Sequence, residues 1–292
     1  MRVTVLADNN ASPCLAAEWG LSMLIEAEGK KILFDLGASD VFLRNAARLN
    51  IDPLNLDYIV ISHGHYDHTW GLDCWLKHNA AIPGMAKKPP VFLAHPAALK
   101  PKFRNDMSEF GILVSETTLK SHFTPVLSRE PVYLTENLIF LGQIPRQLPF
   151  ETSSPLGKTL EPDGSYRDDD LWDDTALVYQ SGHGIVIITG CSHSGICNII
   201  EYATDVCHEP RVLDIIGGFH LLGLNSDDRR LAETARYFKE LNPTVIHPCH
   251  CTDLAAKMAL AQAVKFETAV KEVTAGLTME YYSAESAGIR ST

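Results

Sequence analysis

The sequence lacks several features that mark whole classes of protein. Its seven cysteines are odd in number, widely scattered and without a CxxC pair, which argues against a disulfide framework and against a structural zinc knuckle. No apolar run approaches the roughly 18 residues that span a bilayer, and the first residues have no signal-peptide pattern. We therefore expect a cytoplasmic protein with reduced thiols and no membrane partner.

Positive charge is also scarce. The 292 residues include 25 Lys and Arg against 36 Asp and Glu, a formal net charge of −11. Such a chain repels phosphate backbones, so general nucleic-acid binding is not expected. Hydrophobic residues make up 46% and charged residues 21%, values that exclude disorder, collagen and coiled coil. The length fits one large domain or two, and a homo-oligomer is compatible with it.

What is present is a change of pattern along the chain. Short apolar runs separated by turn signals predict strands in the first sixty residues, with a helix over 40–49. After residue 175, apolar runs at 185–189, 212–216 and 244–246 alternate with helical spacing. This strand–helix repeat predicts a sheet covered by helices.

Two intervening stretches have weaker patterns. Prolines interrupt 78–150, and the polar, turn-rich stretch from 150 to 175 predicts a long loop. Loops of that length in compact proteins are usually lids or linkers. We therefore expect an inserted subdomain or lid at about 78–170.

Histidine is the residue whose placement is unusual. Each of four predicted strands is followed within four residues by histidine, namely His63, His193, His220, and His247 with His250. Ligands of open α/β sheets bind beyond the carboxyl ends of the strands, so these side chains are expected to converge. A lone buried histidine more often satisfies a polar group in a core, but four such placements favour a common site.

The strongest motif is HxHxDH, directly after a predicted strand. His63 and His65 are two residues apart in an extended segment, so they can point the same way and share one ion. Asp67 and His68 lie on the following turn and can reach a second ion. Four ligands cannot complete two coordination spheres. The candidates for the remaining ligands are His193, His220 and His250.

These residues carry a family resemblance. The HxHxDH motif resembles that of the metallo-β-lactamase superfamily, and further stretches resemble its 7,8-dihydropterin-6-ylmethyl-4-(β-D-ribofuranosyl)aminobenzene 5′-phosphate synthase-like branch. Those stretches are 18–22, 32–37, 173–174, 189–195, 216–221 and 250–252. The resemblance implies an α/β (α+β) fold, the αββα four-layer sandwich of two mixed β-sheets with outer helices, as a single domain over 1–292.

The resemblance also implies site residues. His63, His65, Asp67 and His68 match the superfamily's metal motif, and His250 matches its last ligand. The chain departs from the common pattern at Cys191, where many members have a bridging aspartate, and at Asp173 and Asp174, near the place of a missing histidine. We expect His193 to supply that imidazole, with Cys191 or Asp174 bridging the ions or supporting their ligands.

Such ligands suit Zn²⁺, Mn²⁺ or Fe²⁺, and we expect two divalent ions, with Zn²⁺ as the first choice. They would lower the pKa of a shared water and generate hydroxide, and they would attract an anionic small molecule to an acidic protein. Asp67 is expected to accept a proton from that water. His220 is expected to contact a substrate phosphate or donate a proton, or else to bind metal.

The expected function is hydrolysis of a phosphorylated or cyclic small molecule, or the pterin–phosphoribose condensation that the branch implies. The alternatives are a di-iron oxidoreductase or dioxygenase, a lactone or thioester hydrolase, and a non-catalytic metal-binding protein. His95 is a candidate for substrate contact, although a histidine packed in a loop explains its position equally well. Trp19 and Trp70 are further candidates, although core packing is the more common role of such side chains.

Overall fold

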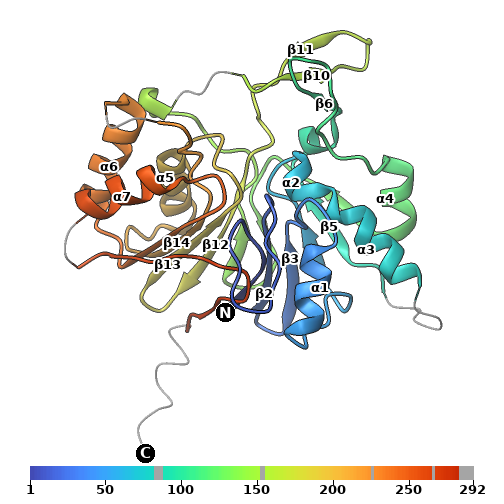
Figure 1. Ribbon diagram of the computed structural model, residues 1–292, viewed down its shortest axis with the longest axis horizontal. Helices are drawn as coiled ribbons and strands as arrows, with labels where there is room; N and C mark the ends of the chain where they lie inside the picture. The colour runs from blue at the N-terminus through green and yellow to red at the C-terminus, as the bar shows by residue number, and fades with distance from the viewer. Residues whose placement is uncertain (82–87, 152–154, 225–226, 265–266, 283–292) are drawn as a thin grey trace, which may run out of the picture.

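Two β-sheets packed face to face form the centre of the molecule, with helices on both outer sides (Figure 1). The computed structural model describes residues 1–81, 88–151, 155–224, 227–264 and 267–282. The expected αββα sandwich of two mixed sheets is confirmed.

The first sheet has seven strands in the described part of the chain, in the order β17–β1–β2–β3–β4–β5–β7. They are β1 (Arg2–Ala7), β2 (Ser22–Ala27), β3 (Lys30–Phe34), β4 (Tyr58–Val60), β5 (Val91–Ala94), β7 (Thr124–Leu127) and β17 (Thr278–Glu280). The pairings from β17 to β3 are antiparallel, and those from β3 to β7 are parallel.

The second sheet repeats this arrangement. Over the described residues its order is β8–β9–β12–β13–β14–β15–β16. The strands are β8 (Val132–Tyr133), β9 (Leu138–Phe140), β12 (Ala176–Ser181), β13 (Gly184–Thr189), β14 (Val212–Gly217), β15 (Val245–Pro248) and β16 (Ala269–Val270). Pairing is antiparallel as far as β13 and parallel from β13 to β16. Each sheet therefore has an antiparallel half and a parallel half.

Buried apolar side chains fill the three spaces between the four layers. Successive residues of a strand point to opposite faces, so Val186 and Ile188 of β13 pack between the sheets, whereas Ile185 and Ile187 pack toward the outer helices. Both faces of the sheet are thus covered. This is why β13 reads in the sequence as one continuous apolar run rather than as an alternation.

Helices cover the outer face of each sheet (Figure 1). Those on the first sheet are α1 (Val41–Arg48), α3 (Gly71–Ala80) and α4 (Glu116–His122), and those on the second are α5 (Ile196–Cys207), α6 (Arg229–Leu241) and α7 (Leu254–Ala263). Asp228 caps α6 and Asp253 caps α7, each accepting backbone N–H groups of the first turn. No helix in the described ranges is long and apolar enough to cross a membrane.

A small sheet projects from the edge of the sandwich, at the top of Figure 1. It consists of β6 (Lys102–Phe103), β10 (Lys158–Leu160) and β11 (Tyr166–Asp168). The expectation of loop throughout 150–175 is therefore wrong, because β10 and β11 pair as an antiparallel hairpin. Of the other strands within 78–150, β5 and β7 belong to the first main sheet and β8 and β9 to the second.

Ile188 tests the packing between the sheets, because its side chain is fully buried there. Ile188→Ala should lower the free energy of unfolding by about 2–5 kcal/mol, since it loses apolar transfer energy and leaves a cavity. Denaturant unfolding measures the loss. Leu254→Ala is the control, because that side chain is 73% exposed on α7 and should cost less than about 0.5 kcal/mol. Equal losses would contradict this core.

Candidate metal centre

The strand-end histidines converge at one edge of the sandwich. His63 follows β4 of the first sheet, whereas His193 follows β13 and His250 follows β15 of the second. All three side chains are buried. They come from parallel strands of both sheets, so the site forms where the two parallel halves meet.

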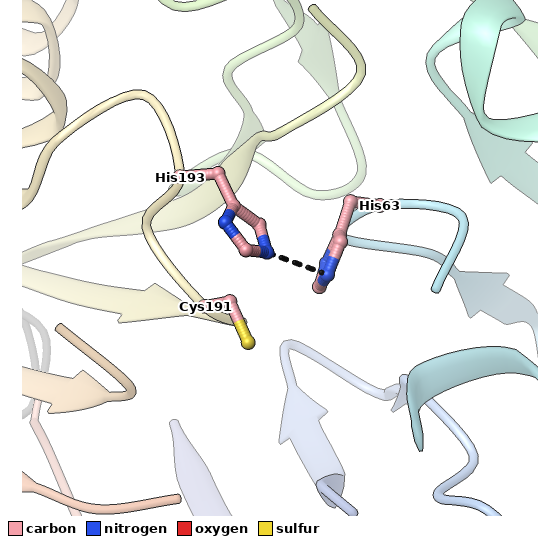
Figure 2. Close-up of side chains that lie close together, drawn as sticks. All are labelled: His63, Cys191 and His193. Atoms are coloured by element: carbon pink, nitrogen blue, oxygen red, sulfur yellow. Dashed lines mark hydrogen bonds between the residues drawn. The ribbon is translucent and has the colours of Figure 1, made fainter. Parts of the chain in front are cut away.

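A first group of ring nitrogens surrounds His63. Its Nε2 lies 3.0 Å from Nδ1 of His65 and 3.2 Å from Nε2 of His193. Figure 2 shows the ring of His193 reaching across to His63, with Cys191 on the same loop as His193. The hydroxyl of Ser62 donates to Asp35 at 2.6 Å, so the Ser62 oxygen accepts the proton of His63 Nδ1 at 3.0 Å. The lone pair of His63 is thereby fixed on Nε2, facing the group.

A second group contains Asp67, His68 and His250. The Nε2 atoms of His68 and His250 are 3.2 Å apart, and a carboxylate oxygen of Asp67 lies 3.4 Å from Nε2 of His250. The Nδ1 atoms bond outward, His68 to Asp35 at 2.6 Å and His250 to the amide oxygen of Asn9 at 3.1 Å. Both inward nitrogens therefore present lone pairs when the rings are neutral.

Cys191 lies between the two groups. Its sulfur is within 4.8 Å of the ligand atoms of His63 and His193, and also within 4.8 Å of those of His68 and His250. Burial raises the pKa of the Cys191 thiol. A third cluster joins Cys191 to His220 and Cys251 within the same limit, and the rings of His220 and His193 lie 4.2 Å apart.

The electrostatic surroundings of the rings differ between the two groups. Burial lowers the pKa of His63, His65 and His193 well below the usual value, and neighbouring cationic side chains add to the effect. For His68 burial acts the same way, but Asp35 and Asp67 outweigh it and raise the pKa to about 9. The contacts of about 3 Å between these ring nitrogens are hydrogen bonds in which one ring supplies the proton, and a divalent cation could take the place of that proton.

Two buried nitrogens add to this observation. Nε2 of His65 and Nδ1 of His220 have no hydrogen-bond partner within the part of the chain that the structure describes. A buried polar atom without a partner is costly. Imidazole, carboxylate and thiol groups converging in this way fit divalent metal ions, and His63, His65, Asp67, His68, Cys191, His193 and His250 are the residues that could hold them.

Two consecutive aspartates hold the ligand loops. Asp173 accepts the backbone N–H of Gly64 at 2.8 Å, between His63 and His65. Asp174 accepts the N–H of Ser194 at 2.9 Å, next to His193. Burial raises the pKa of Asp174 to about 6 despite the hydrogen bonds from Ser194. Through this hydrogen bond Asp174 supports the loop that carries His193.

The site loops contain strained backbone. Ser192, His220 and His250 have positive φ angles of 58°, 50° and 50°, a conformation that costs non-glycine residues roughly 1–2 kcal/mol each. It persists only where surrounding contacts fix it. At His250 the carboxylate of Asp8 accepts the backbone N–H at 3.1 Å. Sequence reasoning missed this support, as it missed Asn9 and Asp35.

Two candidate residues lie away from the ligands. His95 follows β5, but its Nδ1 accepts the N–H of Ala97 and its Nε2 lies 3.2 Å from the amide oxygen of Gln143. Trp70 donates from Nε1 to the carbonyl of Gly111 at 2.8 Å. Neither side chain lines the cavity beside the ligands.

A cavity of about 530 Å³ opens onto the ligands, within the usual range for small-molecule sites. One wall consists of His65, Asp67, Cys191, His193, His220 and Cys251, and the rest is formed mainly by Trp19, Tyr66, Arg104, Phe110, Leu156 and Leu222. Trp19 lines the cavity and donates from Nε1 to Asp67 at 3.0 Å. The cavity thus combines a polar floor with aromatic sides.

Comparison with known proteins identifies the family of the chain. The family model described as "Metallo-beta-lactamase superfamily" matches residues 20–250. The chain belongs to this superfamily. The expected membership is confirmed, and the metal dependence of the superfamily agrees with the clusters of potential ligands in the structure.

Two relatives come from Methanocaldococcus jannaschii. An uncharacterized protein is 34% identical over 266 residues, covering 90% of this chain and 95% of its own. The 7,8-dihydropterin-6-methyl-4-(beta-D-ribofuranosyl)-aminobenzene-5'-phosphate synthase is 31% identical over 261 residues, covering 85% and 86%. The crystal structure of Tm1679, a metal-dependent hydrolase of the superfamily, is 30% identical with a TM-score of 0.80 over 97% of this chain and 100% of that one. The resemblance to the synthase branch is thereby confirmed.

Gly64 tests whether the loop geometry sets metal affinity. A Cβ at this position would lie 2.4 Å from the carbonyl oxygen of Ala98, so Gly64→Ala must displace the backbone between His63 and His65. We expect the affinity for Zn²⁺ to fall at least tenfold, measured by competition with a chelator.

Gly164→Ala is the matched control for backbone strain. Gly164 lies in the turn between β10 and β11, with φ at +82° and no atom within 4 Å of an added Cβ. This variant should bind Zn²⁺ as the wild type does. Unchanged affinity in Gly64→Ala would show that the close packing of the loop does not position the ligands.

Proposed function

We propose that the protein is a metal-dependent hydrolase that acts on a phosphorylated or cyclic small molecule. The observation that carries this proposal is the pair of ligand groups on either side of Cys191, at the floor of a cavity of about 530 Å³. One ion would be held by His63, His65 and His193, and a second by Asp67, His68 and His250. Zn²⁺ is the proposed metal, with Mn²⁺ and Fe²⁺ as alternatives that the same donor set accepts.

Divalent ions at these ligands would supply Lewis acidity, which activates water for attack and neutralises charge that develops on a phosphoryl or acyl oxygen. The protein's own contribution begins with orientation. Ser62, Asp35 and Asn9 hold the outward nitrogens of three of the histidines, which fixes the direction of the inward nitrogens. These histidines are His63, His68 and His250.

Asp67 is placed to take a proton from the attacking water. Burial opposes its charge, but His68 and His250 outweigh burial and lower the pKa of the carboxyl group. The Nε1–H of Trp19 donates to one of its oxygens at 3.0 Å and fixes its direction. An ionised, oriented carboxylate at the cavity wall is suited to proton transfer.

His220 would contact the substrate. It lines the cavity, and its Nδ1 is without a partner among the described residues. When protonated, Nδ1 can donate to a phosphate oxygen or to a leaving group.

A synthase-like activity is the second candidate. The aromatic rings of Trp19, Tyr66 and Phe110 line the cavity and suit a flat ring system. This agrees with the name of the dihydropterin-related synthase, which is 31% identical. Both proposed activities would use the same metal ligands, so the products must be identified to tell hydrolysis from condensation.

His65 tests the catalytic centre. His65→Ala removes a nitrogen 3.0 Å from His63 Nε2, so metal-dependent hydrolysis should fall at least a hundredfold in kcat/KM. A panel of phosphodiesters, lactones and thioesters provides the assay. His183→Ala is the matched control, because His183 is exposed in the turn between β12 and β13 and its loss should leave activity intact. Full activity in His65→Ala would rule out the proposed mechanism.

Metal analysis and metal removal test how many ions the protein binds and whether activity needs them. Protein purified both aerobically and anaerobically should contain two divalent ions per chain by elemental analysis. Stripping them with a chelator should abolish activity and lower the melting temperature, because ligands that bind only the folded state stabilise it. Iron with oxygen-dependent turnover would favour a di-iron oxidoreductase instead, and one ion per chain would contradict the dinuclear site.

A further inference from the structure

The cavity contains a cationic side chain that the metal centre does not use. Arg104 is exposed, lines the cavity and forms no ion pair with any residue in the described ranges. Its guanidinium lies 5.0 Å from the ring centroid of Phe110 and 5.2 Å from that of Tyr66. Contacts with ring faces orient the guanidinium and leave its N–H donors without a carboxylate partner.

Arg104 lies one aromatic ring away from the metal ligands. The ring of Phe110 that contacts Arg104 also lies 4.6 Å from the ring of His65. Tyr66, the other ring under the guanidinium, directly follows His65 in the chain. A substrate bound at the ligands can therefore reach Arg104 across the width of one ring.

The segment that carries Arg104 is fixed to the loop that carries His63 and His65. Lys102 is buried, and its Nζ bonds to Asp169 at 2.6 Å and to Asp173 at 3.0 Å. The other carboxylate oxygen of Asp173 accepts the N–H of Gly64. Asp173 thus joins the two segments, and this buried junction holds Arg104 at a set position relative to the ligands.

Asp106 also lines the cavity but forms no ion pair with Arg104 in the described part of the chain. One of its carboxylate oxygens accepts the backbone N–H of Ser108 at 2.9 Å and the Ser108 hydroxyl at 2.6 Å. A planar guanidinium binds carboxylate or phosphate through two parallel hydrogen bonds. In a chain of net charge −11, an arginine in this position favours the binding of an acidic ligand in the cavity.

We propose that Arg104 is a specificity-determining residue that binds a second acidic group of the substrate, a carboxylate or phosphate, remote from the group held at the metal centre. This inference rests on the proposed function for the location of the substrate. It adds the substrate class, which is a ring-containing molecule with acidic groups at both ends.

The test compares ligands that differ only at the remote end. Calorimetry with the metal-loaded protein would measure binding of phenylphosphonate, 4-carboxyphenylphosphonate and 1,4-phenylenebisphosphonate. The second acid should tighten binding to the wild type about tenfold. The stronger of the two diacids identifies whether carboxylate or phosphate is preferred.

Arg104→Met should reduce this gain to less than twofold while leaving the dissociation constant of phenylphosphonate unchanged. Arg167→Met is the control. Arg167 is exposed on β11 of the small sheet, whose strand β6 directly precedes Arg104, and it is not among the residues that line the cavity. It should behave as the wild type does.

Two results would overturn the inference. The first is that neither diacid binds to the wild type more tightly than phenylphosphonate does. The second is that Arg104→Met weakens the binding of all three ligands equally, which would indicate a structural role. Binding does not depend on turnover, so a wild type that hydrolyses no ester but keeps the diacid preference would contradict the proposed function and support the role of Arg104.

Discussion

The site depends on the crowding of neutral imidazole nitrogens at the edge where the two sheets meet. Burial lowers the pKa of His63, His65 and His193 well below the usual value, and Ser62 turns the lone pair of His63 Nε2 toward the other two rings. Without a cation, His65 and His193 can each donate a ring proton to that lone pair, across 3.0 and 3.2 Å. A cation bound here would replace these hydrogen bonds with coordination by unprotonated ring nitrogens.

Two adjacent aspartates organise the surroundings of this cluster. Asp173 bonds to both Gly64 and Lys102. Asp174, just before β12, bonds to the loop that carries His193. One short segment therefore positions a ligand loop from each sheet together with the projecting small sheet.

The predictable part of the site was the part encoded locally. HxHxDH needs only two-residue spacing after a strand, and His193 and His250 follow strands that read as apolar runs. The partners that orient them were not predictable, because they come from distant segments: Asn9 contacts His250 across 241 positions. His95 has the same strand-end signal, yet its ring bonds to the turn that follows. The β10–β11 hairpin was missed because β11 is exposed throughout and has no apolar alternation.

The repeated strand order of the two sheets has a consequence for assembly. Each proposed ion would take two ligands from the first half of the chain, His63 and His65 or Asp67 and His68, and one histidine from the second half. Neither half can complete a coordination sphere alone. The ions would then act as non-covalent cross-links between the halves, gained only after the sheets have docked, so that a tightly held ion would mark a chain whose assembly is complete.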